Sequence, residues 1–196
     1  MDLTKLKSIL NPIRYTPLII LMLLAISSLT TKIGMSGIRD RQEIRANLYQ
    51  LKSDILNANI ALRNAGIAVT AYDASKELDK MLVTRSSANQ VLDFLTAAKL
   101  SHRERTLVNE MKKERPEYRE AQLKVVDFIK KQQKPEAWSA LHYYQTLMDR
   151  YVQRVDTLLA LSKERETEIF ADTRQLSILL LVFSFAIVVY MFWRVK

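Results

Sequence analysis

The sequence has 196 residues, enough for one sizeable domain with flanking spans, and it contains three glycines, four prolines and no cysteine. Few glycines and prolines disfavour folds rich in tight turns, and the lack of cysteine excludes disulfides, thiolate metal sites and cysteine nucleophiles. The net charge of +9 raises the question of nucleic-acid binding, yet over residues 36–175 the 24 basic residues alternate with 20 acidic ones. This mixture is typical of a solvated helical surface, so we expect no nucleic-acid partner.

The chain starts with a basic tail, residues 1–16, followed by an apolar stretch over residues 17–35 that is uncharged until Lys32. A lysine at that depth can extend its ammonium to the membrane interface. We predict a first transmembrane helix over 17–35. A cleaved signal peptide ending near residues 25–27 is the alternative, and the length of the stretch favours an uncleaved anchor.

The region that follows, residues 36–175, carries apolar residues in heptad spacing, the pattern of helices that pack along a coiled-coil seam. In the first helix the steps alternate between four and three, which predicts one rod continuous with the first span. This seam comprises Ile44, Leu48, Leu51, Ile55, Ala58, Leu62, Ala65, Val69 and Tyr72. A second helix, capped by Asp73 or Ser75, has the seam Leu78, Met81, Arg85, Ala88, Leu92 and Leu95.

Two further helices follow. Ser101 and Glu104 have the spacing of a capping box and predict the start of the third helix. Its seam comprises Leu107, Met111, Glu114, Tyr118, Ala121, Val125 and Phe128. Pro116 lies inside this helix and should bend it or break it locally. Pro135 with Glu136 predicts the start of a fourth helix, because both residues suit a first turn. Its seam comprises Leu141, Tyr144, Met148, Tyr151, Val155, Leu158, Ser162, Arg165 and Ile169.

The fourth helix leads into residues 176–193, which are free of charge and span roughly 27 Å as a helix. Aromatic residues and then the basic tail, residues 194–196, close this second transmembrane helix, as at a cytoplasmic interface. Because both short tails are basic, we expect both termini in the cytoplasm and residues 36–175 in the bacterial periplasm, across the inner membrane.

The predicted fold class is therefore all-α: an antiparallel four-helix bundle with transmembrane helices continuous with its first and fourth helices. Four seam positions are polar, and there we expect water, side-chain pairing or a dimer contact instead of a dry core. They are Arg85, Glu114, Ser162 and Arg165.

The order of these segments resembles the sensor region of bacterial methyl-accepting chemotaxis receptors of the four-helix-bundle type. "DILNANIALRNAGIAVTAYDA" is similar to the family's first helix, and "RSSANQVLDFL" and "ERPEYREAQLKVVDFI" to its second and third. "AWSALHYYQTLMDRYVQRVDTLLAL" is similar to the fourth. The resemblance implies a homodimer paired through helices 1 and 4, and a small ligand bound near that interface. It also implies a signal that travels as a small displacement of the fourth helix.

The family continues after its second span into a HAMP linker and a cytoplasmic coiled coil, whereas the present sequence stops at Lys196. Two alternatives follow. The sequence is either the sensor part of a longer receptor or a stand-alone membrane subunit, structural or regulatory, whose bundle docks onto a partner membrane protein.

The candidate ligand site lies on the outer helices. Arg63 is a forked cation suited to a carboxylate, Asn64 follows it, and Asn57 lies just under two turns earlier. Polar residues of the fourth helix at a comparable distance from the membrane are His142, Tyr143, Gln145 and Thr146. Together they predict a pocket for a small anion, such as an amino or organic acid. The alternative is that Arg63 pairs with an acidic residue and that Tyr144 and Tyr151 fill the core.

We expect neither an enzyme nor a cofactor or metal. The two histidines, His102 and His142, lie far apart, and the acidic residues of 163–168 alternate with basic ones, as on a solvated face. No nucleophile-base pattern, phosphate loop or dinucleotide fingerprint occurs.

Overall fold

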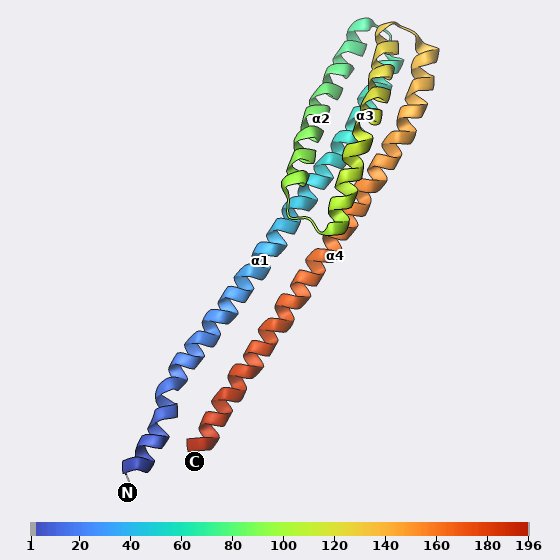
Figure 1. Ribbon diagram of the computed structural model, residues 1–196. Coiled ribbons are helices and arrows are strands. Elements are labelled where there is room, and N and C mark those ends of the chain that lie inside the picture. Colours follow the sequence, from blue (N-terminus) through green and yellow to red (C-terminus); the bar gives the residue numbers. More distant parts are fainter. Residues whose placement is uncertain (1–2, 196) are drawn as a thin grey trace. The chain divides into compact units, whose positions relative to one another are not determined.

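The computed structural model describes residues 3–195, with side chains for residues 17–190 and Trp193; the predicted basic tails, 1–16 and 194–196, lie outside the described side chains. All elements are α-helices: α1 (Leu3–Ile67), α2 (Ala71–Ala97), α3 (His102–Lys130) and α4 (Lys134–Val195) (Figure 1). The prediction of four helices, with the outer two continuous with the apolar stretches, is confirmed.

The chain divides into two compact units, here called the bundle unit, Arg41–Glu164, and the apolar unit, Met1–Asp40 with Arg165–Lys196. The sequence-based range of the bundle, 36–175, is slightly wider at both ends. α1 and α4 pass through both units, while α2 and α3 belong to the bundle unit alone.

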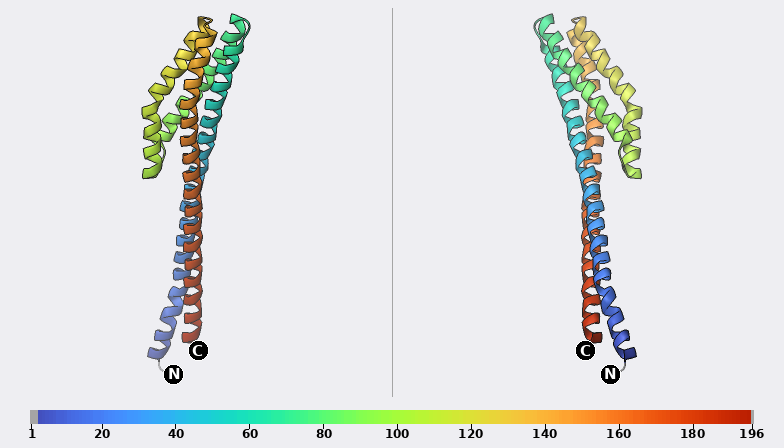
Figure 2. Two further views of the ribbon diagram at one scale, coloured as in Figure 1. Left: turned by 90° about the vertical axis from the view of Figure 1, so that its right-hand side faces the viewer. Right: turned by 90° about the vertical axis from the view of Figure 1, so that its left-hand side faces the viewer.

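Figure 2 shows the four helices of the bundle unit side by side. All four contribute to two clusters of buried apolar residues, and Tyr118 packs against both clusters. The seam of α1 is buried from Ile44 to Ala65, and the seam of α4 from Leu141 to Ser162. Each seam packs because a step of three or four residues returns side chains to the same helix face. Tyr144 and Tyr151 are buried, as expected of core residues.

Two hydrogen bonds between polar side chains join α1 to α4. Lys52 of α1 donates to Asp156 of α4 at 2.7 Å, and Arg63 donates to Gln145, also at 2.7 Å. The partner's number falls on α4 as it rises on α1, which is the pairing expected of antiparallel neighbours.

The end of α1 and the start of α2 differ from the prediction. α1 stops at Ile67, so Val69 and Tyr72 are not part of its seam, and they are 93% and 77% exposed. The N-cap of α2 is Thr70, not Asp73 or Ser75. Its hydroxyl oxygen accepts from the Asp73 backbone N–H at 3.1 Å, which satisfies a donor that the first turn leaves free.

The predicted start of α3 is confirmed as a complete capping box. Ser101 and Glu104 each accept a hydrogen bond from the other's backbone N–H. Pro116 lies inside α3, and the helix continues on both sides of it, so of the predicted bend or local break the break is wrong, while the bend stays a prediction. Its exposed position lets water satisfy the carbonyl that the missing N–H leaves free. Pro135 lies in the first turn of α4, as predicted.

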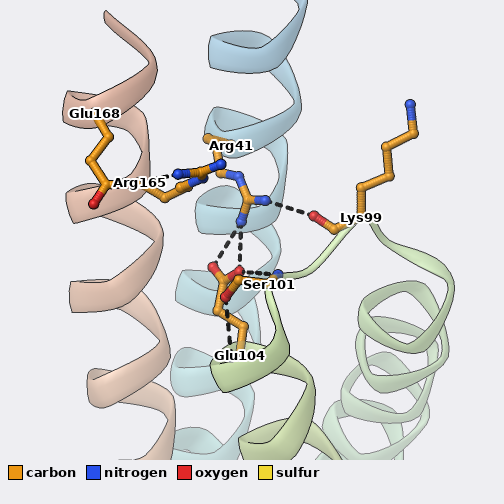
Figure 3. Close-up of polar contacts among 6 residues, drawn as sticks. All are labelled: Arg41, Lys99, Ser101, Glu104, Arg165 and Glu168. Carbon is orange, nitrogen blue, oxygen red and sulfur yellow. Dashed lines mark hydrogen bonds and ion pairs between the residues drawn. The ribbon is translucent and has the colours of Figure 1, made fainter. Parts of the chain in front are cut away.

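A buried ion pair ties α1 to the start of α3 (Figure 3). Arg41 donates to both carboxylate oxygens of Glu104, at 2.8 and 2.9 Å, and to the backbone oxygen of Lys99 at 2.7 Å. The Glu104 side chain is only 1% exposed. Because Glu104 also completes the capping box of α3, its carboxylate holds both Arg41 of α1 and the backbone of Ser101, at the end of the α2–α3 connection.

The apolar unit contains two stretches that are long and apolar enough to cross a membrane, within Pro17–Ile67 and Lys134–Tyr190. α1 and α4 approach closely at Gly34, where an added Cβ would lie 2.6 Å from Cγ2 of Thr173. A Cβ added at Gly37 would lie 3.4 Å from Cγ2 of Ile169, which is an ordinary van der Waals contact. Glycine is needed at residue 34 because a larger side chain would separate the two helices.

The four polar seam residues lie in different environments. Glu114 accepts from Arg154 at 2.7 Å, and Arg165 pairs with Glu168 on an exposed face at 2.6 Å, so the prediction of pairing is confirmed for both. Ser162 is fully buried, and its hydroxyl has no hydrogen-bond partner among the described residues, so pairing does not occur there and the expectation of water or a dimer contact stays a prediction. Arg85 is half-buried and faces a cavity.

Candidate functional site: an arginine-lined pocket

A cavity of about 60 Å³ lies inside the bundle unit and touches all four helices. It has room for a few water-sized groups, since one water needs roughly 10–15 Å³ of such space. We call it the arginine pocket. Its lining residues are Leu51, Asp54, Ile55, Ala58, Thr84, Arg85, Ala88, Asn89, Leu92, Arg115, Tyr118, Arg119, Gln122 and Tyr151.

Three arginines mark the more exposed side of the pocket: Arg85 from α2, and Arg115 and Arg119 from α3. Arg115 donates to Asn89. Among the residues whose side chains are described, Arg85 and Arg119 make no hydrogen bond or ion pair, and Arg115 has no acidic partner. Three guanidinium groups therefore line one cavity, and within the described residues its carboxylate, Asp54, forms no ion pair with them.

This arrangement disfavours the charged state of the Arg85 guanidinium. Burial lowers the pKa of the Arg85 guanidinium, and the positive charges of Arg119 and Arg115 lower it further. An arginine nevertheless keeps its proton in proteins. The repulsion between the arginines therefore lowers the stability of the folded state, and an anion bound in the cavity would offset this repulsion.

The deep side of the pocket is polar and closed. Asp54, Gln122 and Tyr151 are 4%, 3% and 4% exposed. One oxygen of Asp54 accepts from Gln50 at 2.9 Å, while the other, Oδ2, is buried and unpaired among the described residues. The hydroxyl of Tyr151 is buried and unpaired in the same sense. Because native proteins pair nearly all buried polar atoms, two such atoms at one cavity indicate a place for a further partner.

A group of tyrosines supports this wall. The rings of Tyr118 and Tyr151 stack with centroids 5.5 Å apart, and the hydroxyls of Tyr118 and Tyr144 lie 2.6 Å apart. Burial raises the pKa of Tyr144 to about 12 and also raises the pKa values of Tyr118 and Tyr151. The three phenols thus stay neutral hydrogen-bonding groups at physiological pH.

The residues predicted from sequence lie elsewhere, on exposed faces of the helices. Arg63 and Gln145 are brought together, which replaces the acidic partner considered for Arg63. The Thr146 hydroxyl donates to the backbone oxygen of His142, one turn earlier on an exposed face.

The remaining predicted residues make separate contacts. Asn57 donates to Ser53 at 3.3 Å, Asn64 to Glu77 at 3.4 Å, and Tyr143 to Glu117 at 2.9 Å. None of the seven lines the arginine pocket. The outer site they were assigned to stays a prediction.

The heptad pattern predicts the apolar wall of the pocket as core, but of the four charged lining residues it marks Arg85 alone, as a cation at a seam position. It makes no prediction for Asp54, Arg115 and Arg119. The available signal was in the polar residues that flank a seam: Arg115 and Arg119 lie one turn apart on α3, on either side of Tyr118. Their convergence with α2 depends on how two helices pack.

A second cavity, of about 340 Å³, lies where the α1–α2 and α3–α4 connections meet in the bundle unit. Alanines and connection residues form much of its wall, including Ala65, Ala71 and Ala137. Its lysines, Lys130 and Lys134, lie at helix ends. Among the described residues no group of three or more histidine, aspartate or glutamate side chains is placed to hold a metal ion.

No protein-family model, curated protein or solved structure matches this chain.

Proposed function

We propose that this chain is a membrane-anchored sensor whose helical bundle binds a small anion in the periplasm and passes the signal to the membrane through helix displacement. The proposal places the ligand in the arginine pocket, inside one subunit, while the resemblance to chemotaxis receptors supports the sensory role. It assigns binding to Arg85, Arg115 and Arg119.

One observation carries the proposal: three guanidinium groups converge on a cavity without an acidic partner among the described residues. Like charges held together in a partly buried site oppose folding, and replacement by apolar residues would relieve this cost. Clusters of this kind occur where a protein recognises carboxylate or phosphate groups, because the planar fork of arginine matches their oxygens. An anion-binding site accounts for the cluster directly.

Transmission follows from the elements that form the pocket. Tyr151 belongs to α4, which runs as one helix from Lys134 to Val195 and includes the second apolar stretch. A ligand that fits one position of α4 better than another shifts the population toward that position. The size of the shift is limited by the difference in affinity between the two positions.

The proposal includes a homodimer, because α1 carries an exposed apolar row in heptad spacing. Its members are Tyr49, Leu56, Ile60 and Ile67, which are 63%, 39%, 54% and 61% exposed. Rows of this kind pair as coiled coils. Since the chain has no cysteine, Ile60→Cys introduces a single thiol. We expect it to form a disulfide-linked dimer in membranes, whereas Asp93→Cys, on an exposed position of α2, should not.

The function is tested on the full chain in lipid nanodiscs, with thermal unfolding followed by circular dichroism in the presence of small carboxylates and oxyanions. A ligand present at 100 times its Kd should stabilise the bundle by about 2.7 kcal/mol. Arg119→Gln should abolish this gain, and Arg63→Gln, the matched control at the outer site, should keep it.

Three results would contradict parts of this proposal. Unchanged melting curves with every anion would contradict the proposal that the bundle senses a small anion. Loss of the gain in Arg63→Gln alone would move the ligand to the outer site predicted from sequence. Cross-linking of Ile60→Cys to another protein in native membranes would favour the regulatory-subunit alternative.

A further inference from the structure

The two sides of the arginine pocket differ in chemistry, and the difference bears on which anions fit. The three arginines offer donors only, because a guanidinium has no acceptor. On the deep side, Asp54 Oδ2 is a buried carboxylate oxygen without a donor among the described residues. An ionised carboxylate can only accept hydrogen bonds.

We propose that the ligand is a compact anion that carries its own hydrogen-bond donor, and that Asp54 selects for this donor. The inference rests on the proposed function and narrows the class of ligand. The anionic end would face Arg85, Arg115 and Arg119, and the donor would reach Asp54 Oδ2.

The charges favour this orientation over its reverse. An anion without a donor, placed against Asp54, would bring two negative charges together on the closed side of the pocket, where water cannot screen them. Among the described residues the Asp54 side chain accepts one hydrogen bond, from Gln50, so it keeps the capacity to accept from a ligand. No ion pair joins it to an arginine within the part of the chain whose side chains are described.

The space limits the size of the ligand. The cavity measures about 60 Å³, well below the roughly 150 Å³ of an engineered cavity that binds benzene. A ligand of a few non-hydrogen atoms fits, such as a short 2-hydroxy acid or 2-amino acid, or hydrogen phosphate. Each of these ligands has an anionic end, which the arginines can bind, and a hydrogen-bond donor, from which Asp54 can accept.

The test compares matched pairs that differ only in the donor. Binding of glycolate and acetate, and of hydrogen phosphate and sulfate, is measured by calorimetry at constant ionic strength on the full chain in nanodiscs. Leaving a buried acceptor unpaired typically weakens binding by about ten- to a hundredfold. We therefore expect glycolate to bind at least tenfold more tightly than acetate, or hydrogen phosphate at least tenfold more tightly than sulfate.

Asp54→Asn tests the assigned role. An asparagine amide can donate as well as accept, so the preference in either pair should fall to about threefold or less. Arg63→Gln, outside the pocket, should keep the wild-type preference. Should Asp54→Asn not fold, the wild-type comparison still decides between the outcomes.

Equal affinity within both pairs would overturn the inference and leave the proposed function intact, because the anions still bind. An unchanged preference in folded Asp54→Asn would overturn the role of Asp54. Absence of binding by all four anions would count against both.

Discussion

Replacement of Arg85 by leucine should make the bundle more stable and at the same time abolish anion binding. Arg85 occupies a seam position of α2, between Met81 and Ala88, where an apolar side chain would join the core. Its guanidinium is half-buried and lacks a partner among the described residues, and Arg119 and Arg115 oppose its charge.

The magnitude follows from two effects. At an effective dielectric constant of 20, two unit charges about 4 Å apart repel by about 4 kcal/mol, and this energy falls in proportion as the distance grows. Salt at physiological strength has a Debye length of about 8 Å and, with the partial exposure of Arg85, reduces this substantially. A leucine adds some burial of apolar surface. We expect a net gain of about 1 kcal/mol, or a rise in Tm of roughly 4 °C for a domain of this size.

The assay is thermal unfolding of the full chain in nanodiscs, with and without the best-binding anion. Arg85→Leu should melt higher than the wild type without anion and show no further rise with it. Arg63→Leu is the matched control, an exposed arginine on α1 that should lower Tm slightly and keep the response to anion. A lower Tm for Arg85→Leu without ligand, or a preserved response, would refute the reasoning.

Further predictions concern the parts of the fold around the pocket. Glu104→Gln should lower the free energy of unfolding, measured with denaturant, by about 3–5 kcal/mol, because Arg41 stays buried without its charged partner. The double variant Arg41→Met/Glu104→Met should recover most of this stability, and an equal loss in both variants would contradict the explanation. Gly34→Ala should destabilise by about 1–3 kcal/mol through its clash with Thr173, whereas Gly66→Ala, with open space around it, should be neutral or stabilise by up to about 1 kcal/mol. At alkaline pH the bundle should lose stability, because unfolded tyrosines release a proton near pH 10 while Tyr144 holds its own to about 12. Phenolate absorbance and loss of helix should therefore rise together in that window, and full ionisation of the tyrosines in an intact bundle would contradict this.

Much of the fold could be predicted from sequence because heptad spacing directly reports which helix faces are buried. The seam of α4 from Leu141 to Leu158 and the capping box of Ser101 are the clearest cases. The predicted end of α1 is wrong because Val69 and Tyr72 keep the heptad step after the helix has ended at Ile67. Spacing alone cannot distinguish a seam from two apolar residues in a connection.

The pocket was harder to predict for a different reason. Arg85 from α2 and Arg115 from α3 meet only because those helices pack face to face, and no short-range pattern encodes that register. Asp54 gave no signal, since an aspartate beside a seam is usually solvated. Arg63, by contrast, lies beside Asn64 in a sequence pattern that predicts a ligand site, and in the structure its partner is Gln145 on an exposed face.

The most direct measurement of the central claim is nuclear magnetic resonance of the arginine side chains. The full chain, labelled with ¹⁵N-arginine, is titrated in nanodiscs with glycolate and, separately, with hydrogen phosphate, and the tighter-binding anion is used. The Nε–H signals are assigned with single Arg→Lys variants. Our account predicts saturable shifts at Arg85, Arg115 and Arg119 with one shared Kd, and an unmoved signal at Arg63. Saturable shifts at Arg63 alone, or shifts at the three arginines that grow only in proportion to added salt, would contradict it.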